Sequence, residues 1–211
     1  MESFNAVEQE VWDRFISQYD LSDQKAEQLR KYLFLLLEEN KKINLTAITS
    51  VQDVIKFHFD DSLKISNFVD FSKIKSICDV GTGGGFPGIP LKIMFPHVKV
   101  FLIEVIQKKV NFLKKVIEQL SLDSVEVCDL DWRTFLRKSS NEVDLFCARA
   151  SLQPKELIRL FSPALPYKNA KLIYWASDKW KPSDKVANFI EYEKEYVIDD
   201  KRRKLVFLGL K

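Results

Sequence analysis

Glycine is the residue whose placement first indicates a binding site. The chain has six glycines, and five of them lie within eight positions: Gly81, Gly83, Gly84, Gly85 and Gly88. Glycine allows positive φ and lets the backbone come close to a ligand that a side chain would keep away. A tight turn needs fewer glycines, so the segment predicts a loop that holds a small molecule with its main chain. Pro87 or Pro90 can begin a helix directly afterwards, because the first amides of a helix have no internal partner.

Two ligands compete for this loop. Gly83, Gly85 and Gly88 satisfy G-x-G-x-x-G, and Glu104 lies nineteen residues after Gly85, where a ribose-binding acid of a nicotinamide dinucleotide site belongs. Asp79, two residues before the first glycine, would repel a pyrophosphate. S-adenosyl-L-methionine has no phosphate, and its amino and sulfonium groups are cationic. The acidic residues on both sides of the loop therefore favour S-adenosyl-L-methionine over NAD.

The remaining candidate residues have structural interpretations beside the chemical ones. We interpret His58 and Asp61 as a pair that docks a helix on a sheet, in preference to catalysts. Trp132 could stack on an adenine or lie in the core. The cysteines are Cys78, Cys128 and Cys147; they are widely spaced in apolar runs, which predicts buried free thiols in a reducing compartment. Cys147 is therefore expected in the core and not as a nucleophile, and we expect no structural metal.

The first third of the chain has a helical pattern. Apolar residues recur every four positions from Val7 to about Tyr19, and a second helical period runs from Ser22, a candidate cap, to a predicted end at Asn40. Short helical patterns continue to residue 70. We therefore predict that residues 1–70 form a helical segment packed on the domain that follows.

From residue 74 short apolar runs alternate with helical periods. The predicted strands are Ile77–Val80, Val98–Ile103, Val125–Cys128, Val143–Cys147 and Lys171–Trp175, with helices through Val110–Leu120 and from Pro154. This alternation predicts an α/β fold, a mostly parallel sheet with helices on both faces, for residues 71–211. The tail segments Glu191–Val197 and Lys204–Leu208 lack a helix between them, which indicates a closing antiparallel pair. In such a fold the glycine loop lies at the ligand-binding edge of the sheet.

Composition narrows the class of protein. The chain has 211 residues, 46% of them hydrophobic, no apolar run of bilayer length and no basic and apolar leader after Met1, so we expect a soluble, unexported protein. Net charge is +3, with 27 Lys/Arg against 21 Asp/Glu in residues 51–211. The basic residues gather in Lys108–Lys115 and Lys201–Lys204. These clusters are either solvated faces or contacts to nucleic acid.

At the glycine loop the sequence resembles a known family. The run Asp79 to Leu91, DVGTGGGFPGIPL, is similar to the hallmark of the GidB-type methyltransferases of bacterial small-subunit (16S) ribosomal RNA. Asn44-Leu45-Thr46 and His58-x-x-Asp61-Ser62-Leu63 resemble that family's N-terminal signatures. Downstream, Lys108-Lys109 with Phe112-Leu113, and Ala148-Arg149-Ala150, resemble its next blocks, so the likeness covers about residues 30–150.

The resemblance implies a Rossmann-like class I methyltransferase with an N-terminal helical extension, which uses S-adenosyl-L-methionine to methylate guanine N7 in ribosomal RNA. It implies a cytoplasmic bacterial protein, with the small subunit or its RNA as partner. We also expect no membrane association and a monomeric state. It also implies Arg149 as the catalytic residue. The implied cofactor-binding residues are Gly81, Gly83, Gly85, Phe86, Glu104, Asp131, Trp132, Arg133 and Arg149. Guanine N7 is an unprotonated lone pair, so this reaction needs positioning and exclusion of water but no general base.

Two positions depart from the family pattern. After the third strand Asp131-Trp132-Arg133 stands where the family has an arginine followed by an acid, and the fifth strand ends in Ala176-Ser177 instead of Lys-Gly. An alternative is therefore an RNA- or ribosome-binding protein that keeps the fold with weak or altered activity. A less favoured one is an NAD-dependent oxidoreductase.

Overall fold

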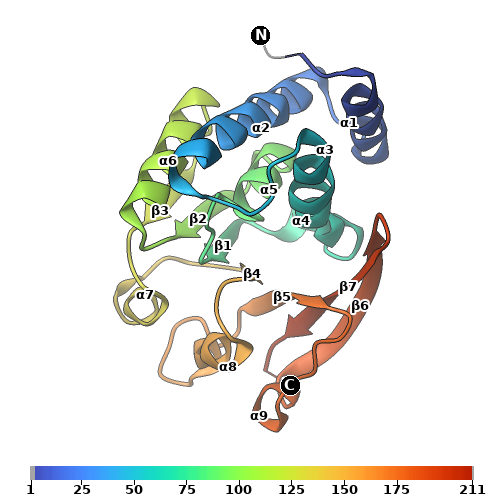
Figure 1. Cartoon of the computed structure of the whole chain (residues 1–211). Helices are drawn as coiled ribbons and strands as arrows, with labels where there is room; N and C mark the ends of the chain where they lie inside the picture. The colour runs from blue at the N-terminus through green and yellow to red at the C-terminus, as the bar shows by residue number, and fades with distance from the viewer. Residues whose placement is uncertain (1–2, 211) are drawn as a thin grey trace.

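The computed structural model describes residues 3–210 as three layers, with a sheet between two sets of helices (Figure 1). The strand order is β3-β2-β1-β4-β5-β7-β6. The strands are β1 (Ser76–Val80), β2 (Lys99–Ile103), β3 (Val125–Cys128), β4 (Leu145–Arg149), β5 (Lys171–Ser177), β6 (Ile190–Ile198) and β7 (Lys201–Leu208). β1 to β5 are parallel, whereas β7 is antiparallel to β5 and β6. The predicted parallel sheet and its closing antiparallel pair are thus confirmed.

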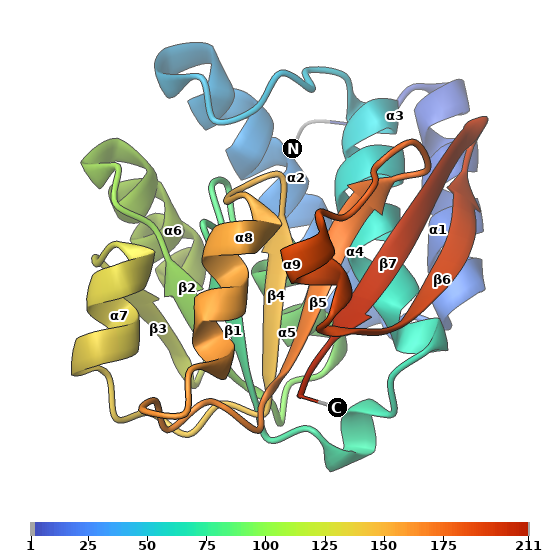
Figure 2. The ribbon, with the colours of Figure 1, turned by 90° about the horizontal axis from the view of Figure 1, so that it is seen from below.

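Helices cover both faces of this sheet. They are α1 (Ala6–Tyr19), α2 (Asp23–Ile43), α3 (Val51–Val54), α4 (Asp61–Leu63), α5 (Gly88–Met94), α6 (Gln107–Gln119), α7 (Trp132–Lys138), α8 (Pro154–Leu157) and α9 (Asp184–Ala187). A π-helical turn, Ile55–Asp60, joins α3 to α4 in one helical run. Figures 1 and 2 show α1, α2, α4, α5 and α6 on one face, and α7, α8 and α9 on the other.

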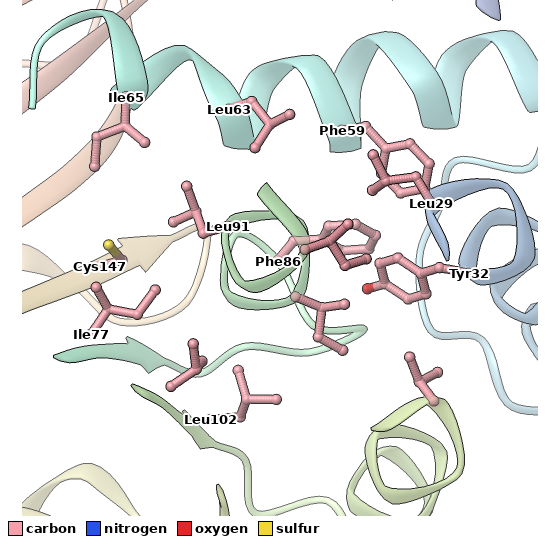
Figure 3. Packing of buried hydrophobic residues seen from close by; sticks show 14 of the residues in the cluster. Leu29, Tyr32, Phe59, Leu63, Ile65, Ile77, Phe86, Leu91, Leu102 and Cys147 are labelled. Atoms are coloured by element: carbon pink, nitrogen blue, oxygen red, sulfur yellow. The ribbon is translucent and has the colours of Figure 1, made fainter. Parts of the chain in front are cut away.

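Each face of the sheet packs against its own apolar cluster. Along β1, Ile77 belongs to the cluster under the N-terminal helices, whereas Cys78 and Val80 belong to the opposite one, because successive side chains in a strand point to opposite faces. Figure 3 shows the first cluster, to which α2, the helical run, α5 and the strands contribute Leu29, Tyr32, Phe59, Leu63, Leu91, Ile77 and Leu102. The helices before residue 70 and the sheet after it therefore share one core.

The two opening helices lie where the periodicity predicts them. Ser22 caps α2, as expected, by accepting a hydrogen bond from the Lys25 amide. The predicted end at Asn40 is wrong, because α2 continues to Ile43 and stops at Asn44 with φ 52°. The Asn40 side chain is instead bonded to both the amide and the carbonyl of Thr46, at 2.8 and 2.9 Å. These bonds fold the chain back after the helix.

The strand ends differ from the predicted ones by a few residues. β4 begins at Leu145, two residues later than expected, and ends with Arg149, which is therefore the last residue of the strand. β7 begins at Lys201, directly after the turn at Asp199, so the basic cluster at the start of β7 is part of the sheet. α5 begins at Gly88, immediately after Pro87.

Candidate active site

A cleft of about 390 Å³ lies at the carboxyl ends of β1, β2 and β4. Ligands of doubly wound sheets bind at this edge. Its walls come from the segment after α2, the π-helical turn, the glycine loop and the loop after β4: Leu45, Thr46, His58, Gly81, Thr82, Gly83, Gly84, Phe86, Glu104, Lys109, Arg149, Ala150, Ser151 and Leu152. A larger hollow of about 740 Å³ lies along α2, but no strand residue lines it. The strand-end cleft is therefore the candidate site.

The glycine loop forms one wall with bare backbone. Gly83 has φ +60°, a conformation that other residues rarely adopt, and a Cβ placed there would meet nothing within 4 Å. A side chain at this position would project into open space. At Gly81, by contrast, a Cβ would lie 2.6 Å from the Ser151 Cβ, so the loop after β4 passes directly against the glycine loop. The absence of a side chain at Gly83 leaves room for a ligand, and its absence at Gly81 leaves room for the loop after β4.

Glu104 is fixed by three backbone amides. Its Oε1 accepts from the amides of Val105 and Ile106, both at 2.9 Å, and its Oε2 accepts from the Gly83 amide at 3.1 Å. The side chain is buried yet lines the cleft. A carboxylate has about four lone-pair sites, so Oε2 can accept a further bond from a ligand hydroxyl.

Asp79 differs from the expectation that it faces a ligand. It is fully buried beneath the loop, where its Oδ2 accepts from Thr82 Oγ1 at 2.6 Å and from the Gly88 amide at 2.8 Å. The start of α5 can pack this closely on β2 only because residue 88 is a glycine. A Cβ there would lie 2.4 Å from the Leu102 side chain. Burial raises the pKa of Asp79 to about 6. Its observed role is thus to brace the loop against α5.

Arg149 reaches from the end of β4 to the helical run before the sheet. Its Nη1 donates to the Phe57 carbonyl at 3.0 Å and to Asp61 Oδ2 at 2.9 Å, and its Nη2 donates to His58 Nδ1 at 2.9 Å. The guanidinium also lies 5.2 Å from the centre of the Phe86 ring. With a side chain 9% exposed, Arg149 is a buried member of the cleft wall.

Asp61 also accepts hydrogen bonds from residues on three other strands, β5, β6 and β7. Its carboxylate accepts from Arg203 at 2.9 Å and from Tyr196 at 2.7 Å, and its carbonyl accepts from Trp175 Nε1 at 3.0 Å. Asp61 is completely buried. The interpretation of His58 and Asp61 as residues that dock a helix on the sheet is therefore confirmed.

His58 lies against the cleft as a neutral ring. It stacks on Phe86 with ring centres 4.2 Å apart, and its Nε2 is 2.8 Å from Thr46 Oγ1. Because a guanidinium only donates, Nδ1 accepts from Arg149 and the ring carries its proton on Nε2. Burial, with Arg149 and Arg203 nearby, lowers the pKa of His58 to about 2. Both nitrogens are engaged, so this histidine is poorly suited to take a proton from a substrate.

The structure does not bring every predicted site residue to the cleft. Gly85 lies on the side of the loop that faces away from the cleft, where a Cβ would lie 2.7 Å from the Tyr32 hydroxyl. Asp131 caps α7, and Arg133 pairs with Glu156 on the surface. Trp132 is buried, its ring stacks with that of Phe135, and its Nε1 donates to the Glu156 carbonyl at 3.0 Å. Of the two interpretations of Trp132, the position in the core is therefore the one that the structure shows.

The cysteines behave as predicted. All three are free and buried, and burial raises the pKa of Cys78 and Cys147 well above the ordinary range. Cys147 lies in the core on the face shown in Figure 3. Within residues 3–210, no group of three or more His, Cys, Asp or Glu side chains is placed to hold a metal ion.

Several cleft residues had no role in the sequence-based interpretation, among them Thr46, Lys109 and Ser151. Thr46 and Lys109 belong to motifs of the resemblance, and Ser151 follows another one directly, so proximity to these motifs was the available signal. What the sequence lacked was any indication that the segment after α2 folds over the glycine loop.

Comparisons with known proteins agree with this geometry. The sequence model of the GidB family, described as rRNA small subunit methyltransferase G, matches residues 25–206. Ribosomal RNA small subunit methyltransferase G of Bacillus cereus (strain B4264) is 43% identical over 145 residues, which are 68% of this chain and 61% of that protein. The protein of the same name from Bacillus thuringiensis (strain Al Hakam) matches to the same extent. The chain thus spans 61% of the length of these curated relatives.

Solved structures share the fold at low identity. M. capricolum TrmK in complex with S-adenosyl-homocysteine has a TM-score of 0.54 at 16% identity, covering 70% of this chain and 66% of that one. A human methyltransferase 10 domain containing protein has a TM-score of 0.59 at 13% identity, covering 83% and 93%. These likenesses establish the class I methyltransferase fold.

The neutral state of His58 gives a testable pH dependence of stability. Asn at position 58 keeps an acceptor for Arg149 but cannot titrate. In the wild type the unfolded chain takes up a proton near the ordinary pKa of 6.5, whereas the folded chain does not until far lower pH, so stability present above pH 6.5 is lost as the pH falls. From about pH 7.5 to about pH 5.5, the free energy of unfolding should drop by about 1.4 kcal/mol more in the wild type than in His58→Asn.

Urea titrations of both proteins at the two pH values measure this difference. Asp79 has the opposite sign, because its raised pKa adds stability at low pH that is lost as the pH rises through about 6. Its contribution is common to both proteins and cancels. Equal changes in wild type and variant would mean that the folded protein protonates His58 normally.

Proposed function

The chain belongs to the GidB family, rRNA small subunit methyltransferase G, and from this premise we propose that it transfers a methyl group from S-adenosyl-L-methionine to guanine N7 in bacterial small-subunit ribosomal RNA. The observation that carries the proposal is the strand-end cleft. There the bare glycine loop and Glu104 face Arg149, and the nearby histidine is held neutral. The site thus offers positioning groups and a fixed positive charge in place of a base.

The residues of the cleft fit the cofactor. Open space at Gly83 admits a ligand against the backbone, and Glu104 Oε2 can accept a bond from a ribose hydroxyl. One polar atom of the cleft wall, Ser151 Oγ, is buried and has no partner in the described chain. A polar group of a ligand can satisfy such an atom. We assign Gly81, Gly83, Glu104 and Phe86 to this site, with Gly85 behind the loop.

The chain's own residues then supply orientation and electrostatics. The cofactor, when bound, provides an electrophilic methyl group on a sulfonium. Arg149 stays protonated at any working pH and uses three of its five N–H groups on Phe57, Asp61 and His58. The other two can hold the cofactor or donate to guanine O6, which would select guanine over adenine because adenine has a donor at that position. His58 secures the guanidinium and accepts no proton from the substrate.

Partner, location and organisation are parts of the same proposal. The small subunit or its RNA is the partner, the chain acts as a monomer in the cytoplasm, and residues 1–70 are a helical extension of the methyltransferase unit 71–211. Within the described residues, no helix is both long and apolar enough to span a bilayer.

The cofactor assignment predicts two affinity losses. Gly83→Leu should abolish S-adenosyl-L-methionine binding, because its side chain fills the open space at a strained φ. Glu104→Gln keeps the shape but weakens a charge-assisted bond, at roughly 1–3 kcal/mol. Calorimetric titration measures both, with Glu126→Gln on the exposed side of β3 as a matched control. Wild-type affinity in both cleft variants would exclude this cofactor site, and preferential binding of NAD would favour the oxidoreductase.

The catalytic assignment predicts a defect in Arg149→Lys. Lysine keeps the charge but loses the planar fork, so methyl transfer should fall at least about tenfold, or about 1.4 kcal/mol, while the fold survives. Mass spectrometry of nucleosides, after incubation with unmethylated small subunits, measures 7-methylguanosine. Arg159→Lys, an exposed ion-paired arginine, is the control. Wild-type turnover in Arg149→Lys would remove Arg149 from the mechanism, and tight RNA binding without 7-methylguanosine in the wild type would favour an RNA-binding protein.

A further inference from the structure

A second hollow, of about 580 Å³, adjoins the cleft at the same edge of the sheet. It is bounded by the carboxyl end of β5 (174–177), the turn 178–180 and the first residues of β7 (201–203). Arg149 and Ala150 line both this groove and the cofactor cleft. Ala150 has φ +51°, a strained conformation of the kind that clusters at functional sites. The two hollows therefore share one wall.

The groove is strongly basic. Five cationic side chains line it against one carboxylate, that of Asp178. Arg149 and Arg203 share one carboxylate, Asp61, whereas Lys179 and Arg202 are exposed and make no ion pair with any residue in 3–210. Lys201 is also exposed and lies 4.0 Å from the centre of the Phe57 ring. Three cations are thus available to a polyanion at the mouth of the groove.

An aromatic ring lines the same groove. Trp180 is half-buried and lines the groove. Its ring lies 5.5 Å from Tyr174 and 5.4 Å from Lys204 Nζ, which is itself paired with Glu193. A fixed indole beside lysine and arginine is the combination with which proteins bind single-stranded nucleic acid, since bases stack on the ring and phosphates meet the cations.

We propose that this groove binds the single-stranded RNA that flanks the target guanine, with Trp180 stacked on an unpaired base and Lys179, Lys201 and Arg202 on phosphates. The proposal rests on the proposed function, because the shared wall at Arg149 places the bound strand next to the methyl-transfer cleft. The other basic cluster, on α6, is less suited. Lys115 there is paired with Glu39 and Phe112 is buried, so α6 offers charge without a ring for stacking.

The test is equilibrium binding of a guanine-containing single-stranded RNA oligonucleotide to the full chain across a salt series. Lys201→Ala/Arg202→Ala should weaken binding and lower the slope of log affinity against log salt by about 1.4, since each lost phosphate contact on a single strand removes about 0.7. Trp180→Ala should weaken binding about fivefold or more, and Trp180→Phe should restore most of it. Affinity for S-adenosyl-L-methionine should stay unchanged in all of them.

A matched control removes two cations from the opposite edge of the sheet. Lys138 and Lys168 are exposed and precede β4 and β5, so Lys138→Ala/Lys168→Ala should bind RNA like the wild type. Thermal unfolding verifies that each variant is folded. If Trp180→Ala is unstable, Trp180→Leu takes its place, because leucine keeps apolar volume but has no ring on which a base can stack.

Two results would overturn the proposal that this groove binds RNA. One is an unchanged salt slope in Lys201→Ala/Arg202→Ala, and the other is a slope that responds to Lys108→Ala/Lys114→Ala on α6 instead. Methyl transfer to small subunits separates this failure from that of the proposed function. If the wild type methylates small subunits while the groove variants bind RNA with unchanged affinity, only the proposal that the groove binds RNA is refuted. If the wild type binds RNA through these residues but transfers no methyl group, RNA binding in the groove is supported and the proposed methyltransferase activity is refuted.

Discussion

One buried carboxylate, Asp61, determines how the N-terminal helices meet the edge of the sheet that carries the cleft. Its side chain accepts from Arg149, Arg203 and Tyr196, and its carbonyl accepts from Trp175. These partners lie on β4, β7, β6 and β5. An uncompensated buried charge costs several kcal/mol, so the carboxylate must remain where all its donors can reach it. The helical run that carries Asp61 is therefore held at one position over the strand ends.

The same contacts fix the geometry of the cleft wall. The π-helical turn presents the Phe57 carbonyl and the His58 ring to Arg149, while Asp61 balances the charge of the guanidinium. Burial, together with the positive charges of Arg149 and Arg203, lowers the pKa of His58 and keeps the ring neutral, and Arg149 occupies its Nδ1. The opposite wall is backbone, braced from beneath by Asp79. A pocket of this kind orients reactants and stabilises charge without exchanging protons, which suits a nucleophile that has no proton to lose.

Much of the fold could be predicted because it follows from local patterns. Strand and helix periods indicated β1 to β7, and the density of glycine identified the loop. The docking of the His58–Asp61 segment on the sheet could be predicted, but its partners there could not. Arg149 and Arg203 lie 88 and 142 residues from Asp61, and no spacing encodes such pairs. For the same reason the burial of Asp79, the packing of Trp132 in the core and the place of Thr46 in the cleft depend on tertiary structure.

A double-mutant cycle on Asp61 and Arg149 tests the central claim most directly, namely that this ion pair joins the helical segment to the sheet edge that carries the cleft. Asp61→Asn, Arg149→Met and the double variant are compared by free energy of unfolding in urea. Asp61→Asn leaves the Arg149 guanidinium without a carboxylate, and Arg149→Met leaves Asp61 with Arg203 as its remaining ion-pair partner, whereas the double variant contains neither member of the pair. The loss of the Arg203 contact is common to Asp61→Asn and the double variant, so it cancels in the cycle. The single costs should therefore exceed the double cost, with a coupling of at least about 2 kcal/mol. Costs that add to within about 0.5 kcal/mol would contradict the claim, because they would mean that the two residues stabilise the protein independently.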